Sequence, residues 1–214
     1  MGKGKRNGKG SDNKLLFGFD NVHYAVYDEA SDTYDAPVLL GSGLTGAGAV
    51  SFSLKPEGDK AQFFANNTLF HTQTQDNGLS GDLMMSKFPA QYLVDTLGWV
   101  YDEAGMLIEA ANVPQKPHAL LFEVMGTESP VRVVLYNCRG SKPTRDYKTN
   151  ESSPKFDGET MEVTATPRSF GWVTTAKASL VRDENPAAFD SFFKTVMLPE
   201  EPAKLGAGKP GETP

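Results

Sequence analysis

The chain of 214 residues has a single cysteine and no excess of positive charge. Cys138 cannot form an intramolecular disulfide, and its place at the end of the apolar run 131–138 predicts a small buried side chain rather than a nucleophile. Lys and Arg total 21 against 27 for Asp and Glu, a formal net charge of -6. The chain therefore lacks the overall basic surface that attracts nucleic acid or anionic membranes.

The first residues are an exception to this acidic balance. Basic side chains alternate there with glycine: Lys3, Lys5, Arg6 and Lys9. Such a segment can bind nucleic acid, but it is more often a solvated terminus, which is the interpretation we favour. Residues 1–13 and 199–214 offer little apolar surface to bury, so we predict a basic N-terminal arm and a C-terminal tail, both flexible, on a single-domain body of residues 14–198.

Long hydrophobic runs are also missing. The longest apolar stretch after the basic start is Leu15–Phe19, which Gly18 interrupts. It is too short for the core of a signal peptide and far short of the roughly 20 residues of a membrane span. We therefore expect a protein made in the cytoplasm that is neither exported by that route nor embedded in a membrane.

Motifs that carry catalytic or metal chemistry are scarce as well. The sequence contains no G-x-S-x-G elbow and no phosphate-binding G-x-x-x-x-G-K-[ST] loop. The histidines fall in separate predicted strands, without metal-ligand spacing: His23, His71 and His118. Three acids on predicted strands could in principle serve a glycoside hydrolase: Asp82, Glu123 and Glu162. Because acids of this kind occur in any β protein, we expect no catalytic residue, no metal, no cofactor and no enzymatic activity.

Alternation of apolar and polar residues is what the sequence does contain, and it predicts half-buried strands. The sets that share one face are Val22, Tyr24 and Val26; Val50, Phe52 and Leu54; and Met161, Val163 and Ala165. Residues 120–124 and 131–136 are apolar on both faces and flank a turn-forming cluster, which predicts a central hairpin. A second hairpin is predicted for residues 69–75 and 79–87, across Asp76-Asn77-Gly78. A last strand is predicted to begin at Trp172.

Two helices are predicted within this β-rich pattern. The stronger begins at Pro186, after the N-cap residue Asn185. Its apolar side chains recur at helical spacing and should pack on a sheet: Phe189, Phe192, Phe193 and Val196. The weaker helix begins near Pro89 and ends at Gly98. Residues 29–48 have little periodicity, and so long a connection is uncommon unless it is functional, so we expect contacts outside the domain to order it.

Several blocks, taken in order, resemble the major tail proteins of long-tailed bacteriophages (siphoviruses), the phi13-type family. The blocks are DNVHYAV at 20–26, LKPEGD at 54–59, FFANN at 63–67, NGLSGDL at 77–83, ALLFEV at 119–124, VLYNC at 134–138, TATPR at 164–168 and FFK at 192–194. They span nearly the whole body, about residues 20–198. Two departures stand out: the start is longer than expected for the family, and residues 39–48 look like an insertion.

The resemblance implies a mainly β subunit, a β-sandwich or barrel-like tail-tube domain with a packed C-terminal helix and a short second helix. Such subunits form hexameric rings that stack into a hollow tube in the virion tail, through which DNA is ejected. The implied partners are further copies of the chain, the tape-measure, tail-terminator and baseplate proteins, and DNA in transit. We expect the loop 29–48 to contact the neighbouring ring; its candidate residues are Asp32, Tyr34, Asp35, Leu40 and Leu44. The sequence does not identify the strands that would line the bore of such a tube. The alternative function is a β-sandwich module that binds carbohydrate or a cell-surface partner.

Overall fold

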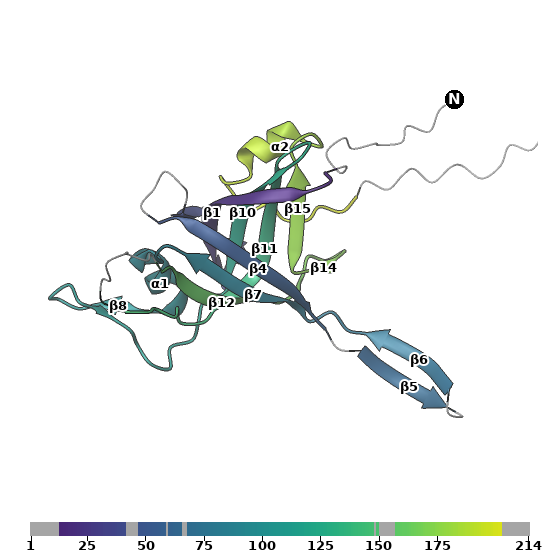
Figure 1. Cartoon of the computed structure of the whole chain (residues 1–214), viewed down its shortest axis with the longest axis horizontal. Coiled ribbons are helices and arrows are strands. Elements are labelled where there is room, and N and C mark those ends of the chain that lie inside the picture. The colour runs from purple at the N-terminus through teal and green to yellow at the C-terminus, as the bar shows by residue number, and fades with distance from the viewer. Residues whose placement is uncertain are drawn as a thin grey trace, which may run out of the picture.

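The computed structural model describes residues 13–41, 47–58, 60–65, 68–147, 149 and 157–202, with no side chains described for 60–74. The described chain is mainly β with two short helices (Figure 1), as predicted. The main strands are β1 (Leu16–Asp28), β4 (Ala49–Glu57), β7 (Gly78–Met85), β10 (His118–Gly126), β11 (Val131–Gly140), β12 (Glu159–Ala165) and β15 (Lys177–Val181). The shorter elements are β2 (Thr33–Tyr34), β3 (Val38–Gly41), β5 (Lys60–Ala65), β6 (Thr68–Thr74), β8 (Val100–Tyr101), β9 (Leu107–Ile108), β13 (Arg168–Ser169), β14 (Thr174–Thr175), α1 (Ala90–Leu97) and α2 (Pro186–Ser191).

One antiparallel sheet folds over on itself to make two layers. Its strand order is β2-β1-β10-β11-β12-β7-β4, with β3 also paired to β1 and β15 also paired to β11. The turning point is β11, whose first half pairs with β15 and whose end pairs with β12. Asn137 lies between the two halves with φ 48°, and its side chain donates to the Thr166 hydroxyl. A left-handed residue there lets β11 bend from one layer into the other.

The interior between the layers is the main core. Alternate residues of β1, β7, β10, β11 and β12 point into it, together with the buried face of α1. The opposite face of β10 and β11 supports a second cluster under α2: Ala25, Ala119, Leu121, Val134, Tyr136 and Phe192. Both faces of these central strands are covered, so their residues are apolar almost throughout. Strands β10 and β11 pair antiparallel, which confirms the predicted central hairpin.

The two layers approach closure where β1 meets β4. These strands share no ladder in the described residues, but three phenylalanines bridge them. The ring of Phe19 lies 5.3 Å from that of Phe122 and 6.1 Å from that of Phe52, and the last two are 5.7 Å apart. Bulges at Gly18 and Asn21, both with positive φ, bend β1 around the core. The result is a barrel-like sandwich that aromatic packing closes along one seam.

Two of the three predicted alternating sets face the core as expected, and the third is partly wrong. Phe52 and Leu54 pack against the core, whereas Val50 is exposed. The cause is a bulge in β4: Ala49 pairs with Met85, but Ser51 pairs with the adjacent Met84. The extra residue shifts the register by one, so Ala49 replaces Val50 on the core side.

The predicted hairpin of residues 69–75 and 79–87 is wrong. Strand β6 pairs with β5, while β7 pairs with β4 and β12. Gly78 does adopt a positive φ of 108°, and the Asp76 carboxylate accepts from its N–H at 2.9 Å. This turn, however, returns the chain from the projecting β5–β6 hairpin into the sheet instead of closing a tight hairpin (Figure 1).

Both predicted helices are present, but α2 ends at Ser191, so Phe193 and Val196 of the predicted helical stripe follow the helix and pack on the second cluster from the segment after it. In α2 the Asn185 side chain accepts from the N–H of Ala188 at 3.1 Å, and Pro186 occupies the first turn. Phe189 and Phe192 are buried beneath the helix. In α1 the left-handed Gly98 ends the helix with φ 70°. The predicted last strand is broken at Ala176, so that β14 and β15 replace one continuous strand.

The segment 29–48 is more ordered by its own chain than the sequence indicates. Within it β2 and β3 both pair with β1, and Leu40 lies in the main core with 1% of its surface exposed. The expectation that only outside contacts order this segment is therefore wrong for residues 29–41. Residues 42–46 lie outside the described part of the chain.

Candidate assembly surfaces

The described residues show the environments of two of the three histidines. Across that part of the chain, no group of three or more His, Cys, Asp or Glu is placed to hold a metal ion. His23 stacks on Phe193 with ring centroids 4.3 Å apart. His118 is fully buried and lies 3.1 Å from the Tyr92 hydroxyl, and burial lowers its pKa to about 4. The side chain of His71 is outside the described set.

Cys138 is buried in the main core, as predicted. Burial raises the pKa of its thiol to about 12, so the thiol stays protonated at neutral pH. A protonated, inaccessible thiol is inert as a nucleophile.

Of the three acids that could in principle serve a glycoside hydrolase, two lie side by side and the third lies on the other layer. Glu123 forms an ion pair with Arg132 at 2.7 Å on one layer. Asp82 and Glu162 are cross-strand partners on the other layer, and both are exposed. They belong to an open sheet face, where β4, β7 and β12 place mainly hydroxyl and charged side chains side by side. We call this the polar face; its residues are Ser51, Ser53, Lys55, Ser80, Asp82, Met84, Thr160, Glu162 and Thr164.

The five residues predicted to contact a neighbouring ring occupy different environments. Asp32 is exposed and pairs with Arg168 at 2.6 Å. Tyr34 is half-buried against Tyr136, and Asp35 is exposed at the surface. Leu40 is buried in the core, so its side chain is not available to a second copy, and Leu44 lies outside the described residues.

Arg168 holds the turn 29–32 against the body of the domain. Its guanidinium lies 4.2 Å from the ring centroid of Tyr27, 5.1 Å from that of Tyr34 and 5.3 Å from that of Phe170. Cation–π contacts of this kind add to the ion pair with Asp32. Sequence reasoning missed Arg168, because three of its partners, Tyr27, Asp32 and Tyr34, lie more than 130 residues away in the chain.

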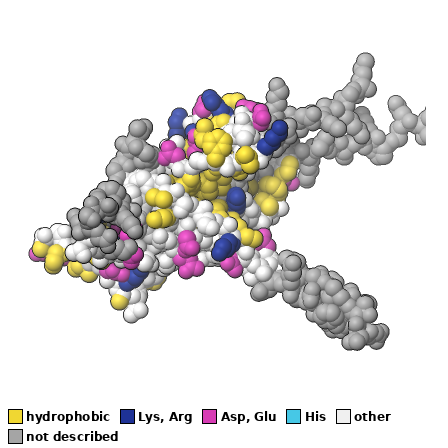
Figure 2. Space-filling model, in the orientation of Figure 1, with side chains coloured by type: hydrophobic (Ala, Val, Ile, Leu, Met, Phe, Trp, Pro, Cys, Tyr) yellow, Lys and Arg dark blue, Asp and Glu magenta, His cyan; other side chains and the backbone are white. Residues whose placement is uncertain are grey.

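The first exposed apolar surface lies where β1 begins. Four large side chains there are 45–68% exposed, and we call them the β1 band: Leu15, Leu16, Phe17 and Met125. Figure 2 shows hydrophobic side chains gathered along β1 on this side of the molecule. The sequence signal for this surface is the short apolar run 15–19.

A second exposed apolar surface lies on the projection that follows α1. Strands β8 and β9 form its hairpin, through the pairs Val100–Ile108 and Tyr101–Leu107. Five large side chains of this projection are 40–61% exposed, and we call them the 100–113 lobe: Val100, Tyr101, Met106, Ile108 and Val113. Several exposed large apolar side chains in one region are a feature of interaction sites in soluble proteins.

Unpaired strand edges accompany these surfaces. Within the described residues β4 pairs only with β7, and β15 pairs only with β11. The hairpin of β5 and β6 extends well beyond the sandwich (Figure 1). Free edges and projecting hairpins provide backbone donors and acceptors that a second chain can use.

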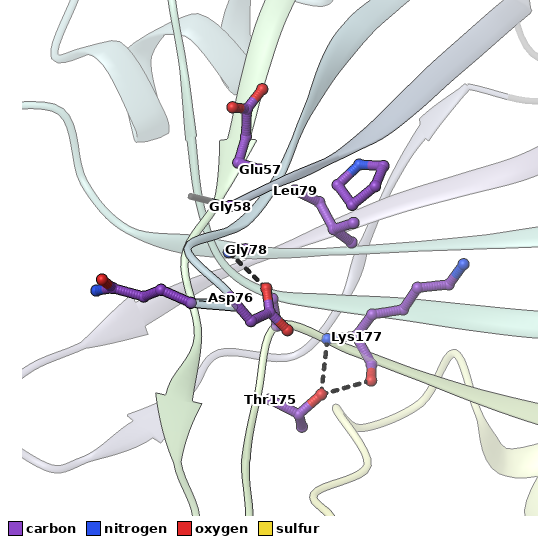
Figure 3. A pocket seen from close by; sticks show the side chains of 10 residues that line it. Glu57, Gly58, Asp76, Gly78, Leu79, Thr175 and Lys177 are labelled. Atoms are coloured by element: carbon purple, nitrogen blue, oxygen red, sulfur yellow. Dashed lines mark hydrogen bonds between the residues drawn. The ribbon is translucent and has the colours of Figure 1, made fainter. Parts of the chain in front are cut away.

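A cleft of about 460 Å³ lies at the base of the β5–β6 hairpin (Figure 3). Its polar groups bond mainly within their own turns. Asp76 accepts from Gly78, and the Thr175 hydroxyl donates to the carbonyl of Lys177 at 2.9 Å. Glu57 accepts from the hydroxyl of Ser80. Since the charged side chains of Glu57 and Lys177 point away from each other in Figure 3, the cleft has no converging polar groups that would select a small ligand.

No helix in the described part of the chain combines the length and apolar character needed to cross a membrane.

No protein-family model matches this sequence, and no curated protein matches it. Among solved structures, the chain is similar to the tube terminating cap of the anti-feeding prophage. The TM-score is 0.42 at 10% sequence identity, and the similar region covers 78% of this chain and 93% of that chain.

Proposed function

We propose that this protein is a structural subunit of a bacteriophage tail tube, which assembles into hexameric rings that stack around a channel for DNA. The observation that carries the proposal is the combination of two separate exposed apolar surfaces with unpaired strand edges on one small domain. A monomer gains nothing from exposing the β1 band and the 100–113 lobe, because both favour association or aggregation. Repeated contacts with identical copies would cover them.

The sequence blocks that resemble tail proteins support the proposal by their positions in the fold. Six of the eight blocks lie wholly or partly in β1, β4, β7, β10, β11 and β12, the strands that make the two layers. The other two do not: FFANN begins in β5, and FFK follows α2. The segment that looks like an insertion, residues 39–48, begins in β3, and its residues 42–46 lie outside the described part of the chain. The resemblance thus falls mainly, though not only, in the strands of the two layers.

The polar face of β4, β7 and β12 is our candidate for the lining of the bore. It presents two acids, one lysine and five hydroxyl side chains in cross-strand rows such as Ser53, Asp82 and Glu162. Such a surface has few cations to bind phosphate groups, so DNA would pass without being held by counterion release. The opposite layer cannot serve, because α2 covers its outer face.

In this proposal the protein is not an enzyme and uses no cofactor. Its partners are further copies of itself, the other tail components at the ends of the tube, and DNA in transit. It resides in the virion tail after synthesis in the host cytoplasm. The buried side chains of Cys138 and His118 then contribute to packing of the core and take no part in a reaction. The exposed acids contribute surface charge.

Electron microscopy of the purified protein over a range of concentrations tests the proposal. We expect rings of six subunits or tubes, formed without added cofactor. Because the start of a tube can require an initiating complex, the same test includes lysates in which the other tail proteins are produced. A protein that stays monomeric in both settings and binds glycans on an array would refute the tail-tube role and favour the carbohydrate-binding alternative.

A further inference from the structure

The surroundings of His118 fix which of its ring nitrogens carries the proton. The Nδ1 atom lies 3.2 Å from the carbonyl oxygen of Lys116, and the Nε2 atom lies 3.1 Å from the hydroxyl of Tyr92. A carbonyl oxygen can only accept a hydrogen bond, so the proton belongs on Nδ1, and the neutral imidazole then has a lone pair on Nε2. The Tyr92 hydroxyl therefore donates to Nε2.

The Tyr92 hydroxyl has a second acceptor within reach. The sulfur of Met161 lies 3.6 Å from it, but a thioether accepts hydrogen bonds only weakly. Burial raises the pKa of Tyr92, so the hydroxyl keeps its proton. Its one proton goes to the stronger acceptor, Nε2, as long as the imidazole is neutral. The three side chains come from α1, β10 and β12, and all of them are fully buried.

The bond between Tyr92 and His118 attaches α1 to β10. The two rings pack edge to face, with centroids 5.5 Å apart. Two further hydrogen bonds attach the same helix. The Asp95 carboxylate accepts from the Tyr24 hydroxyl at 2.7 Å, and the Thr96 carbonyl accepts from the N–H of Lys116 at 2.9 Å. Since α1 leads directly into the 100–113 lobe, these bonds also position the lobe.

The charged and titratable groups around His118 favour a neutral imidazole. Its cross-strand partner on β11 is Cys138, whose thiol stays protonated because burial raises its pKa to about 12. The charge of Arg139, also on β11, lowers the pKa of His118 and adds to the effect of burial. On α1, the Asp95 carboxylate bonds to the Tyr24 hydroxyl of β1 and to the Gln91 side chain.

We propose that Tyr92, His118 and Met161 form a buried latch that holds α1 on the sheet and weakens when His118 takes up a proton from the solvent. The added proton binds Nε2, which changes from an acceptor to a donor. The Tyr92 oxygen then accepts from Nε2, and its hydroxyl turns toward the sulfur of Met161. These reversed bonds do not compensate for burying a positive charge that Arg139 repels, so α1 and the lobe are held less firmly in acid.

Nitrogen NMR of the labelled protein at pH 7 tests the direction of the bond. We expect the His118 ring to carry its proton on Nδ1 and to have an unprotonated Nε2. The variant His118→Gln identifies these signals by their loss. A ring protonated at Nε2 instead would overturn the latch, because the Tyr92 hydroxyl could not then donate to it.

Titration of the same signals tests the part of Met161. Met161→Leu leaves the bond of the neutral state in place but removes the acceptor that the reversed Tyr92 hydroxyl needs. We expect it to lower the pKa of His118 by about 0.5, the size of a weak hydrogen bond. The matched control is Met85→Leu, the same nearly volume-conserving change at another fully buried methionine of the main core. Equal effects of the two variants, or none, would remove Met161 from the latch. Should acid unfold the domain first, the pH dependence of urea unfolding gives the pKa by linkage.

Hydrogen exchange tests whether α1 opens as a separate unit. We expect the amides of residues 93–97 to be less protected than those paired between β10 and β11. Their protection, corrected for intrinsic rates, should fall by about tenfold or more between pH 7 and 4.5 in the parent, but not in His118→Gln. The control Asp95→Asn removes the other titratable group of the helix and should keep this fall.

Equal protection of α1 and the central strands would overturn the latch, because the helix would then open only with the whole domain. Loss of the pH response in Asp95→Asn would also overturn it and assign the response to the carboxylate. The latch belongs to the single subunit. Its failure therefore leaves the tail-tube role standing, and failure to form rings or tubes leaves the latch standing.

Discussion

At the scale of single residues, His118 links stability to pH. It is buried in the main core beside the Tyr92 hydroxyl, and burial lowers its pKa from 6.5 to about 4. The unfolded chain therefore binds a proton below pH 6.5, while the folded chain stays neutral until about pH 4. The contribution of neutral His118 to the free energy of unfolding is therefore fully present above pH 6.5. It is lost as the pH falls from 6.5 to about 4, and the loss is on the order of 3 kcal/mol.

We expect His118→Gln to remove this part of the pH dependence. The variant should be less stable than the parent at pH 7 by about 1–3 kcal/mol, because a core hydrogen bond is disturbed. The difference should shrink toward pH 4.5, where the parent has lost the contribution of the histidine. Urea unfolding across this pH range measures it. Burial also lowers the pKa of the half-buried His23, so His23→Gln should show a smaller effect of the same sign. Parallel curves for the parent and His118→Gln would show that the buried imidazole does not titrate in this way.

Sequence patterns predicted side-chain burial well and long-range charge contacts poorly. The burial of Cys138 follows from its apolar neighbours, which any reader of the sequence can see. The environments of Arg132 and Arg168 do not, since their aromatic partners come from distant segments and no local pattern marks them. Leu40 was predicted to contact a neighbouring ring, and its burial was not predicted, for a related reason. Residues 29–48 lack periodicity, and it is the pairing of β3 with β1 that places Leu40 in the core.

At the scale of elements, Arg132 attaches α2 to the sheet. Its guanidinium lies 4.0 Å from the ring centroid of Phe189 and 4.5 Å from that of Phe193, and it also bonds to the Phe189 carbonyl. Glu123 balances its charge at 2.7 Å. We predict that Arg132→Ala destabilises the domain by about 2–4 kcal/mol, because it leaves Glu123 unpaired and removes the stacking under the helix. Urea unfolding measures this, and the exposed Arg139→Ala should change stability by less than about 0.5 kcal/mol.

The polar face offers a change that should stabilise the subunit. Asp82 and Glu162 are directly opposite each other on β7 and β12, and like charges in that position repel. Glu162→Gln should therefore raise the free energy of unfolding by about 0.2–1 kcal/mol at pH 7. The gain should diminish at high salt, where surface repulsion is screened. Glu184→Gln, in the turn after β15, is the control; an equal gain there would mean that net charge, and not the cross-strand pair, is responsible.

Local sequence patterns do not predict the order of the strands in the sheet. The triplet Asp76-Asn77-Gly78 has the residues of a tight hairpin turn, yet the partners of β7 are β4 and β12. A turn motif reports the local path of the backbone but not which distant strand pairs beside it. Val50 shows the same limit within one strand, because a single bulge moved it from the core side to the surface.

At the scale of the whole molecule, the burial of Leu40 makes deletion of residues 39–48 a poor test of assembly. Removing residues 39–48 would take away three of the four residues of β3 and a core side chain, so a failure to assemble would reflect a damaged subunit. The β1 band and the 100–113 lobe are better targets, because their exposed side chains can be changed without loss of the core. Neither surface follows from alternation in the sequence, since exposure of apolar residues is a property of the folded chain.

The proposed bore leads to a prediction about DNA. If the polar face lines the channel, the double variant Asp82→Lys, Glu162→Lys converts a repulsive surface into one that binds phosphate groups in every subunit. The cross-strand pair stays like-charged, so the stability of the subunit should be nearly unchanged. We expect tubes of this variant to retain DNA at low salt and to release it steeply as salt rises, in a filter-binding assay. The control Asp183→Lys, Glu184→Lys makes the same change in net charge in the turn after β15. Equal DNA retention by both variants would place the polar face outside the channel, because a lining surface should retain DNA more strongly than one elsewhere on the tube.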